Sequence, residues 1–218
     1  MRRLALIFGV ILFAVAGSAG AFELKEGQHY SVFSPPKATD SRDKIEITEF
    51  FWYGCGHCYN LEPVLQKWLK KLPKDVVFRR VPAVFPGRDG GPGSWAPAAK
   101  LYYAMEALGL LDKLHGEVFD AIHIERINLQ NEKTMLEWMG KKGVDTAKFA
   151  DVYNSFAVQA KVSRSMQLTQ SHELDGVPAL IVDGHYKPST GAAGSNEDVL
   201  AVVDQLIEKV RKERAAKK

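Results

Sequence analysis

The fold is decided at Glu49-Phe50-Phe51-Trp52-Tyr53-Gly54-Cys55-Gly56-His57-Cys58-Tyr59, where an aromatic run typical of a buried strand meets a helical pattern. The only two cysteines of the 218-residue chain lie here, with two residues between them. Cys55 falls at the first turn of the expected helix, where unpaired backbone N–H groups and the positive end of the helix dipole favour a thiolate. The segment therefore predicts a strand followed by a helix that begins at a reactive thiol.

The neighbouring residues complete a strand, helix, strand unit. Residues rich in β-branched and aromatic side chains run from Lys44 to Trp52 and from Val76 to Val81. Between them a helix is expected from about Gly56 to Lys71, with an apolar stripe at Leu61, Leu65, Trp68 and Leu72. The two strands of such a unit are expected to be parallel, with a right-handed crossover.

A linker rich in glycine and proline, Pro86 to Gly93, separates this unit from a stretch with only helical patterns, in which five helices are expected. Strand residues return at 177–182 and, after Asp183-Gly184, at 185–187, which predicts a β-hairpin. A capping box at Ser195 starts a last helix. The sequence thus predicts an α/β fold in which a mixed sheet flanked by helices, residues 22–88 and 173–218, is interrupted by an all-helical insertion, residues 89–172.

The first 21 residues are typical of an export signal. A basic start at Arg2 and Arg3 precedes an apolar run from Leu4 to Ala16, and small residues follow. We expect cleavage after Ala21, because the apolar run is too short to span a bilayer comfortably. Without Arg2 and Arg3 the chain keeps 27 basic and 26 acidic residues, and this near neutrality gives no reason to expect a nucleic-acid partner.

Three uses of the cysteine pair compete. A stabilising crosslink is a weak explanation, because the chain-entropy model gives only about 2 kcal/mol for so short a loop. A structural zinc site is incomplete, since zinc takes four ligands and the sequence has neither a second Cys-x-x-Cys nor a suitably spaced histidine pair. A redox couple needs only the residues present, and it is the favoured interpretation in an exported protein with two cysteines. No metal or other cofactor is expected.

Helical position predicts unequal roles for the two sulfurs. Cys55, nearest the helix start, is expected to be the exposed thiol of low pKa that exchanges with substrates, and Cys58, one turn further, the buried resolving partner. His57 is expected to stabilise the Cys55 thiolate further. A strongly lowered pKa of Cys55 would make a disulfide donor, whereas a pKa near 7 would suit a reductant.

The cysteine segment, the distant Val177-Pro178 and the helical insertion together resemble the DsbA family of periplasmic thiol:disulfide interchange proteins, which has a thioredoxin fold. The resemblance covers essentially the whole chain after the signal. It implies a periplasmic enzyme that donates a Cys55–Cys58 disulfide to reduced, unfolded exported proteins through a mixed disulfide at Cys55. It further implies reoxidation by a quinone-linked membrane partner of the DsbB kind, and we expect a monomer.

The resemblance also implies roles for residues around the pair. Pro178 is expected to follow a cis peptide bond, which leaves the backbone of Val177 free to pair with an extended substrate. Glu49 is expected to be a buried acid that manages protons near the inner sulfur, with Arg80 at the position where the family has a lysine. Because arginine does not release its proton, this difference puts the proton relay in question. Gly56 replaces the proline of the best-known members, a departure that bears on the redox potential.

Substrate binding is expected to use backbone pairing and an apolar surface to which Trp52, Tyr53, Tyr59 and Val177 contribute. Two alternatives remain open. The first keeps the fold but assigns disulfide isomerase or reductase activity, although residues 22–43 are too short for the N-terminal dimerisation domain that such isomerases usually carry. The second, less favoured, is a peptide-binding chaperone or a metal carrier that uses Cys55, His57 and Cys58 as soft ligands.

Overall fold

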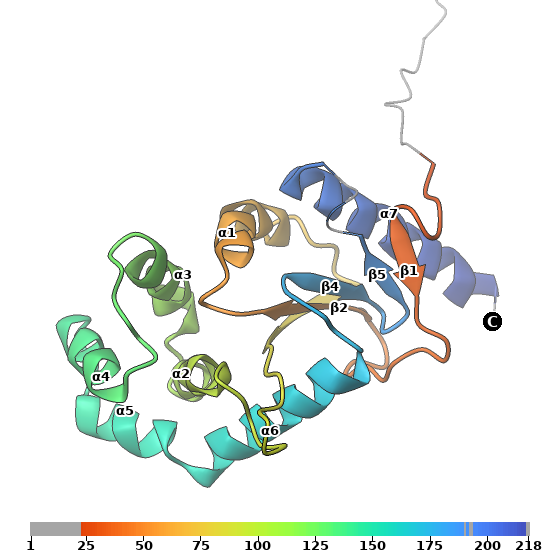
Figure 1. Cartoon of the computed structure of the whole chain (residues 1–218). Coiled ribbons are helices and arrows are strands. Elements are labelled where there is room, and N and C mark those ends of the chain that lie inside the picture. Colours follow the sequence, from red (N-terminus) through yellow and green to blue (C-terminus); the bar gives the residue numbers. More distant parts are fainter. Residues whose placement is uncertain (1–22, 190, 192–193, 217–218) are drawn as a thin grey trace, which may run out of the picture.

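A computed structural model of the chain describes residues 23–189, 191 and 194–216 (Figure 1). The predicted signal and its cleavage site lie outside the described residues. Five strands form one sheet in the order β1-β5-β4-β2-β3. Their bounds are β1 (Tyr30–Val32), β2 (Ile45–Phe51), β3 (Val76–Pro82), β4 (Ala179–Val182) and β5 (Tyr186–Pro188).

The sheet is mixed, as predicted. β2 and β3 are parallel, with Glu49 opposite Arg80, whereas β4 is antiparallel to both β2 and β5. The predicted hairpin is present because Asp183 and Gly184 both have positive φ angles, 54° and 64°, as its tight turn requires. A Cβ atom at Gly184 would lie 2.1 Å from the carbonyl oxygen of Lys37, so this position accepts only glycine.

Helices cover both faces of the sheet (Figure 1). On one face α1 (Gly56–Leu69) and α7 (Asn196–Ala216) pack Leu65 and Leu206 against Ile47 of β2. The other face, which includes Phe50, packs against residues at the end of α6 (Phe156–Ser171) and in the loop that follows it. Since successive strand residues point to opposite faces, β2 is buried throughout and forms the centre of the core.

The predicted insertion of five helices is confirmed. It consists of α6 and of α2 (Ala96–Ala107), α3 (Leu111–His123), α4 (Glu132–Lys141) and α5 (Thr146–Tyr153). Asp145 and Ser155 cap α5 and α6 through backbone N–H groups, as their sequence positions indicate. All five helices lie within residues 89–172, although the exact domain boundaries stay a prediction.

The core of the insertion extends to the cysteine segment. Phe51, Tyr53 and Cys58 belong to the same buried cluster as Leu114 and Phe119 of α3. The insertion therefore packs directly against the end of β2 and the start of α1. None of the described helices is long and apolar enough to cross a membrane.

Candidate active site

Cys55 occupies the N-cap of α1. Its backbone is extended, with φ −89° and ψ 117°, and its sulfur accepts a hydrogen bond of 3.4 Å from the backbone N–H of Cys58. Both cysteines are free thiols; Cys55 is half-buried and Cys58 is 1% exposed. The predicted arrangement, with Cys55 outward and Cys58 inward, is confirmed because the helix turn that exposes one sulfur rotates the other into the core.

The surroundings move the pKa values of the two thiols in opposite directions. The hydrogen bond from the Cys58 side chain lowers the pKa of Cys55 most. The backbone N–H groups of Cys58 and His57 and the charge of His57 lower it further. The pKa therefore falls to about 6 despite the partial burial of this sulfur. The hydrogen bond to Cys55 and burial raise the pKa of Cys58 far above its ordinary value. At neutral pH the first proton therefore leaves from Cys55.

Val177 and Pro178 lie beside the outer sulfur, although they are more than a hundred residues away in sequence. The Val177-Pro178 peptide bond is cis, as the family resemblance implies. The thiol of Cys55 donates a hydrogen bond of 3.3 Å to the carbonyl oxygen of Val177. A cavity of about 280 Å³ adjoins this contact; it is lined by His57, Leu61, Val177, Pro178, Gly191, Asn196 and Val199.

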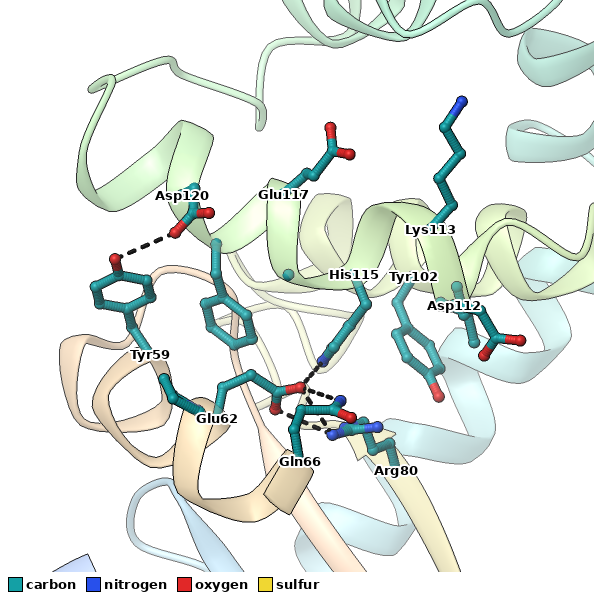
Figure 2. Close-up of a pocket in the computed structure, with 14 residues that line it drawn as sticks. Tyr59, Glu62, Gln66, Arg80, Tyr102, Asp112, Lys113, His115, Glu117 and Asp120 are labelled. Carbon is teal, nitrogen blue, oxygen red and sulfur yellow. Dashed lines mark hydrogen bonds and ion pairs between the residues drawn. The ribbon is translucent and has the colours of Figure 1, made fainter. Parts of the chain in front are cut away.

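Two buried carboxylates and a partly buried arginine lie beneath the pair. Glu49 on β2, 2% exposed, accepts a hydrogen bond of 3.0 Å from Nε of Arg80 on β3. Nη2 of Arg80 also lies 3.0 Å from each carboxylate oxygen of Glu62 on α1 (Figure 2). Burial raises the pKa of Glu49 to about 7, although Arg80 opposes this. The predicted buried acid and its arginine partner are thus in contact, and a second acid shares the same cation.

Glu62 and Arg80 line a pocket of about 660 Å³ between α1 and α3 (Figure 2). His115 of α3 enters it from the side opposite Glu62. Its Nδ1 lies 2.7 Å from the hydroxyl of Tyr53, whereas its buried Nε2 lies 3.6 Å from Glu62, too far for a hydrogen bond, and has no hydrogen-bond partner in the part of the chain that the structure describes. Among the residues that the structure describes, no three His, Cys, Asp or Glu side chains are grouped so as to hold a metal ion.

The aromatic residues expected on the substrate surface divide into two groups. Trp52 and Tyr59 are half-buried; Trp52 stacks on Trp95 with centroids 4.4 Å apart. For Tyr53 the predicted contribution to an exposed surface is wrong. Its side chain is 1% exposed, because the insertion packs over it and His115 binds its hydroxyl. Tyr53 therefore belongs to the core that packs against the turn between Trp52 and Cys55.

Sequence reasoning missed three residues of this region: Glu62, His115 and His123. A signal for Glu62 existed, since it follows Cys58 by four positions and so lies on the buried side of the same helix. The two histidines carried no such signal. They reach the cysteine segment only because α3 packs against α1, a long-range contact that helical periodicity does not encode.

Residues 46–204 match the family model described as the DSBA-like thioredoxin domain. The chain belongs to the DsbA family. The thiol:disulfide interchange protein DsbA of Pseudomonas aeruginosa is 37% identical over 219 residues, with both chains fully covered. The protein of the same name from Bordetella parapertussis is 41% identical over 208 residues, which cover 95% of this chain and 96% of that one.

Solved structures of DsbA proteins have the same fold. The crystal structure of P. aeruginosa DsbA superposes with a TM-score of 0.81 at 38% identity and covers 89% of this chain and 97% of its own. An oxidoreductase from N. meningitidis superposes with a TM-score of 0.77 at 32% identity, covering 88% of this chain and 96% of its own. This chain is accordingly a DsbA-type thiol:disulfide oxidoreductase with a thioredoxin-like fold and a helical insertion.

Proposed function

We propose that this DsbA-family chain oxidises reduced, unfolded proteins in the periplasm after export. A substrate thiolate attacks Sγ of Cys55 in the Cys55–Cys58 disulfide, and Cys58 departs as a thiolate that takes up a proton. A second substrate thiolate then attacks the substrate sulfur of the mixed disulfide and releases the Cys55 thiolate. Two electrons pass from substrate to enzyme. A membrane partner of the DsbB kind, linked to quinone, restores the enzyme's disulfide.

The low pKa of Cys55 carries the proposal. A thiolate that is stable at neutral pH is a good leaving group and favours the reduced enzyme, which makes the disulfide a donor. With a pKa of about 6, and with allowance for solvent screening at this half-buried sulfur, the reduced form gains about 1 kcal/mol at pH 7, or about 20 mV of oxidising power. His57 supports the assignment because its backbone N–H and its charge both act on this sulfur.

Substrate chains are proposed to lie along Val177 and Pro178. Their position beside Cys55 supports this, because an extended peptide that pairs with the Val177 backbone would present its sulfur to Cys55. The adjoining cavity of about 280 Å³ offers apolar walls from Leu61 and Val199, which suit apolar side chains of many kinds. We propose that the enzyme acts as a monomer and without a cofactor other than its own disulfide.

Two titrations test this function. Thiolate absorbance of the reduced protein against pH gives the pKa of Cys55, and equilibration with glutathione gives the redox potential. We expect a pKa of about 6 and rapid oxidation of a reduced, unfolded protein by the disulfide form. A pKa of Cys55 above about 7 would overturn the oxidant assignment. Faster recovery of a protein with scrambled disulfides than of a reduced one would favour the isomerase alternative.

A further inference from the structure

The last turn of α3 contacts the cysteine segment on both sides of the cysteine pair. Nε2 of His123, the final residue of α3, lies 2.8 Å from the carbonyl oxygen of Tyr53, two residues before Cys55. One turn earlier, Asp120 accepts a hydrogen bond of 3.1 Å from the hydroxyl of Tyr59, the residue directly after Cys58 (Figure 2). The helical insertion therefore holds both residues that flank the catalytic loop.

The contact with Tyr53 fixes the chemistry of the His123 ring. A carbonyl oxygen only accepts hydrogen bonds, so Nε2 must carry the hydrogen. The ring is held in place by Tyr59, on which it stacks with centroids 4.8 Å apart and planes 13° apart, and by Phe119 at 6.1 Å. His123 is thus an oriented donor.

Tyr53 lies between His123 and the turn that precedes Cys55. Its side chain is already fixed, because its hydroxyl bonds to His115 and its ring packs edge-on against Phe51 and Phe119. Its carbonyl group lies inside the turn that the Cys55 N–H closes by donating to Trp52 at 3.0 Å. The orientation of the peptide between residues 53 and 54 therefore places the start of α1, and with it the sulfur of Cys55.

We propose that His123 is a positioning residue through which the helical insertion sets the reactivity of Cys55. The inference rests on the thiol exchange proposed above. By holding the carbonyl of Tyr53, His123 keeps the turn in the geometry in which the Cys58 N–H reaches the Cys55 sulfur. Without the donor, the peptide rotates more freely and this N–H stabilises the thiolate less.

A matched pair of variants tests the donor separately from the ring. His123→Phe keeps an aromatic ring on Tyr59 but removes the N–H, whereas His123→Gln restores an N–H donor of similar reach without the ring. In His123→Phe we expect a higher pKa of Cys55 and an equilibrium constant for reduction by glutathione that is smaller by up to about twofold, because the Cys58 N–H supplies only part of the thiolate stabilisation. In His123→Gln both quantities should stay near those of the unaltered protein.

Ile124→Ala is the control, because Ile124 follows His123 on the same helix end and is 65% exposed. It should change neither quantity. An unaltered pKa and glutathione equilibrium in His123→Phe would overturn the proposal. A protein that exchanges no disulfide even without substitutions would contradict the proposed function instead.

A second measurement needs no variant. The nitrogen-15 chemical shifts of the imidazole in the intact reduced protein report which ring nitrogen of His123 carries the hydrogen. We expect hydrogen on Nε2 at pH values at which the ring is neutral, together with slowed exchange of that hydrogen with water. A neutral ring with hydrogen only on Nδ1 would exclude the bond to Tyr53 and overturn the proposal even if His123→Phe fails to fold.

Discussion

The two sulfurs of the cysteine pair have different surroundings on its outer and inner sides. On the outer side, backbone N–H groups and a carbonyl contact the sulfur of Cys55, and a cavity lined by His57, Val177 and Pro178 lies beside them. On the inner side, Cys58 is enclosed by apolar packing, with the charges of Glu49 and Arg80 below it. The two residues are chemically identical and one helical turn apart. Their division of labour therefore comes from environment alone.

This difference separates reactivity from stability. The outer side relies on groups that α1 and the loop at Val177 supply in any case, so substitutions there are expected to change exchange chemistry more than folding. The inner side depends on one cation that faces two buried carboxylates, and such a cluster is strongly destabilised when one member is removed.

The largest effect is expected when the two sulfurs are removed one at a time. Cys55→Ser should lower the rate of substrate oxidation by about a thousandfold or more, because the attacked sulfur is lost. Cys58→Ser should retain exchange at Cys55 but accumulate mixed disulfides, since the resolving thiol is absent. Oxidation of a reduced protein measures the first effect, and non-reducing electrophoresis after incubation with a disulfide-bonded protein, which the Cys55 thiolate attacks, measures the second. Equal trapping of substrate by the two variants would show that the sulfurs are not divided in this way.

The inner side is tested by Arg80→Met, which leaves two buried carboxylates without their cation. We expect the free energy of unfolding to fall by about 3–5 kcal/mol at pH 7. Chemical denaturation of the reduced protein measures the change. Arg211→Met is the matched control, because Arg211 forms an ion pair with Asp75 at the surface and should contribute less than about 1 kcal/mol. Similar losses in both variants would contradict the distinction.

Two glycines near the cysteine pair differ in the space available for a side chain, which is filled at Gly54 and free at Gly56. A Cβ at Gly54 would lie 2.4 Å from the ring of Trp52, which Trp95 holds in place, so Gly54→Ala should cost about 1–3 kcal/mol. A Cβ at Gly56 meets nothing within 4 Å, and Gly56→Ala should stabilise α1 by up to about 1 kcal/mol. Thermal and chemical denaturation check both. A destabilised Gly56→Ala would mean that the outer side is packed after all.

The smallest expected effect is a change in the pH dependence of the redox potential. Below the pKa of Cys55, reduction takes up two protons per two electrons, and the reduction potential falls by about 59 mV for each unit by which the pH rises. Above pH about 6 only Cys58 binds a proton, so the slope should halve to about 30 mV per pH unit. Glutathione equilibria at several pH values measure the slope. Glu49→Gln is the control, because the pKa of Glu49 is about 7 and its ionisation falls in the same pH range. A change of slope that comes from Cys55 must persist in this variant.

The pH dependence of stability has a definite sign for the reduced protein. Because the pKa of Cys55 is lowered on folding, this thiol stabilises the native state at alkaline pH and loses its contribution as the pH falls through about 6. The pKa of Glu49 is raised by burial, so its ionisation between pH about 4.5 and about 7 works against the native state. The two groups oppose each other in the neutral range.

Local patterns in the sequence were sufficient to predict most of the helices, strands and turns. The alternation and β-branched residues of β2 and β3, the apolar stripe of α1, the turn at Asp183-Gly184 and the caps at Asp145 and Ser155 each depend on neighbours within a few positions. The same local logic placed Cys55 at a helix start and Cys58 one turn inside. The burial of Tyr53 was missed because it depends on which distant helix covers the strand end.

The sequence by itself determined the α/β fold, the helical insertion and the unequal positions of Cys55 and Cys58, because short-range periodicity and helix geometry control them. Only the tertiary structure decided the contacts of Val177 with Cys55, of Glu62 with Arg80, and of His123 with Tyr53. These pairs are joined by the packing of separate elements. Their distances follow from how a whole sheet and its helices fill space, which no local pattern of residues specifies.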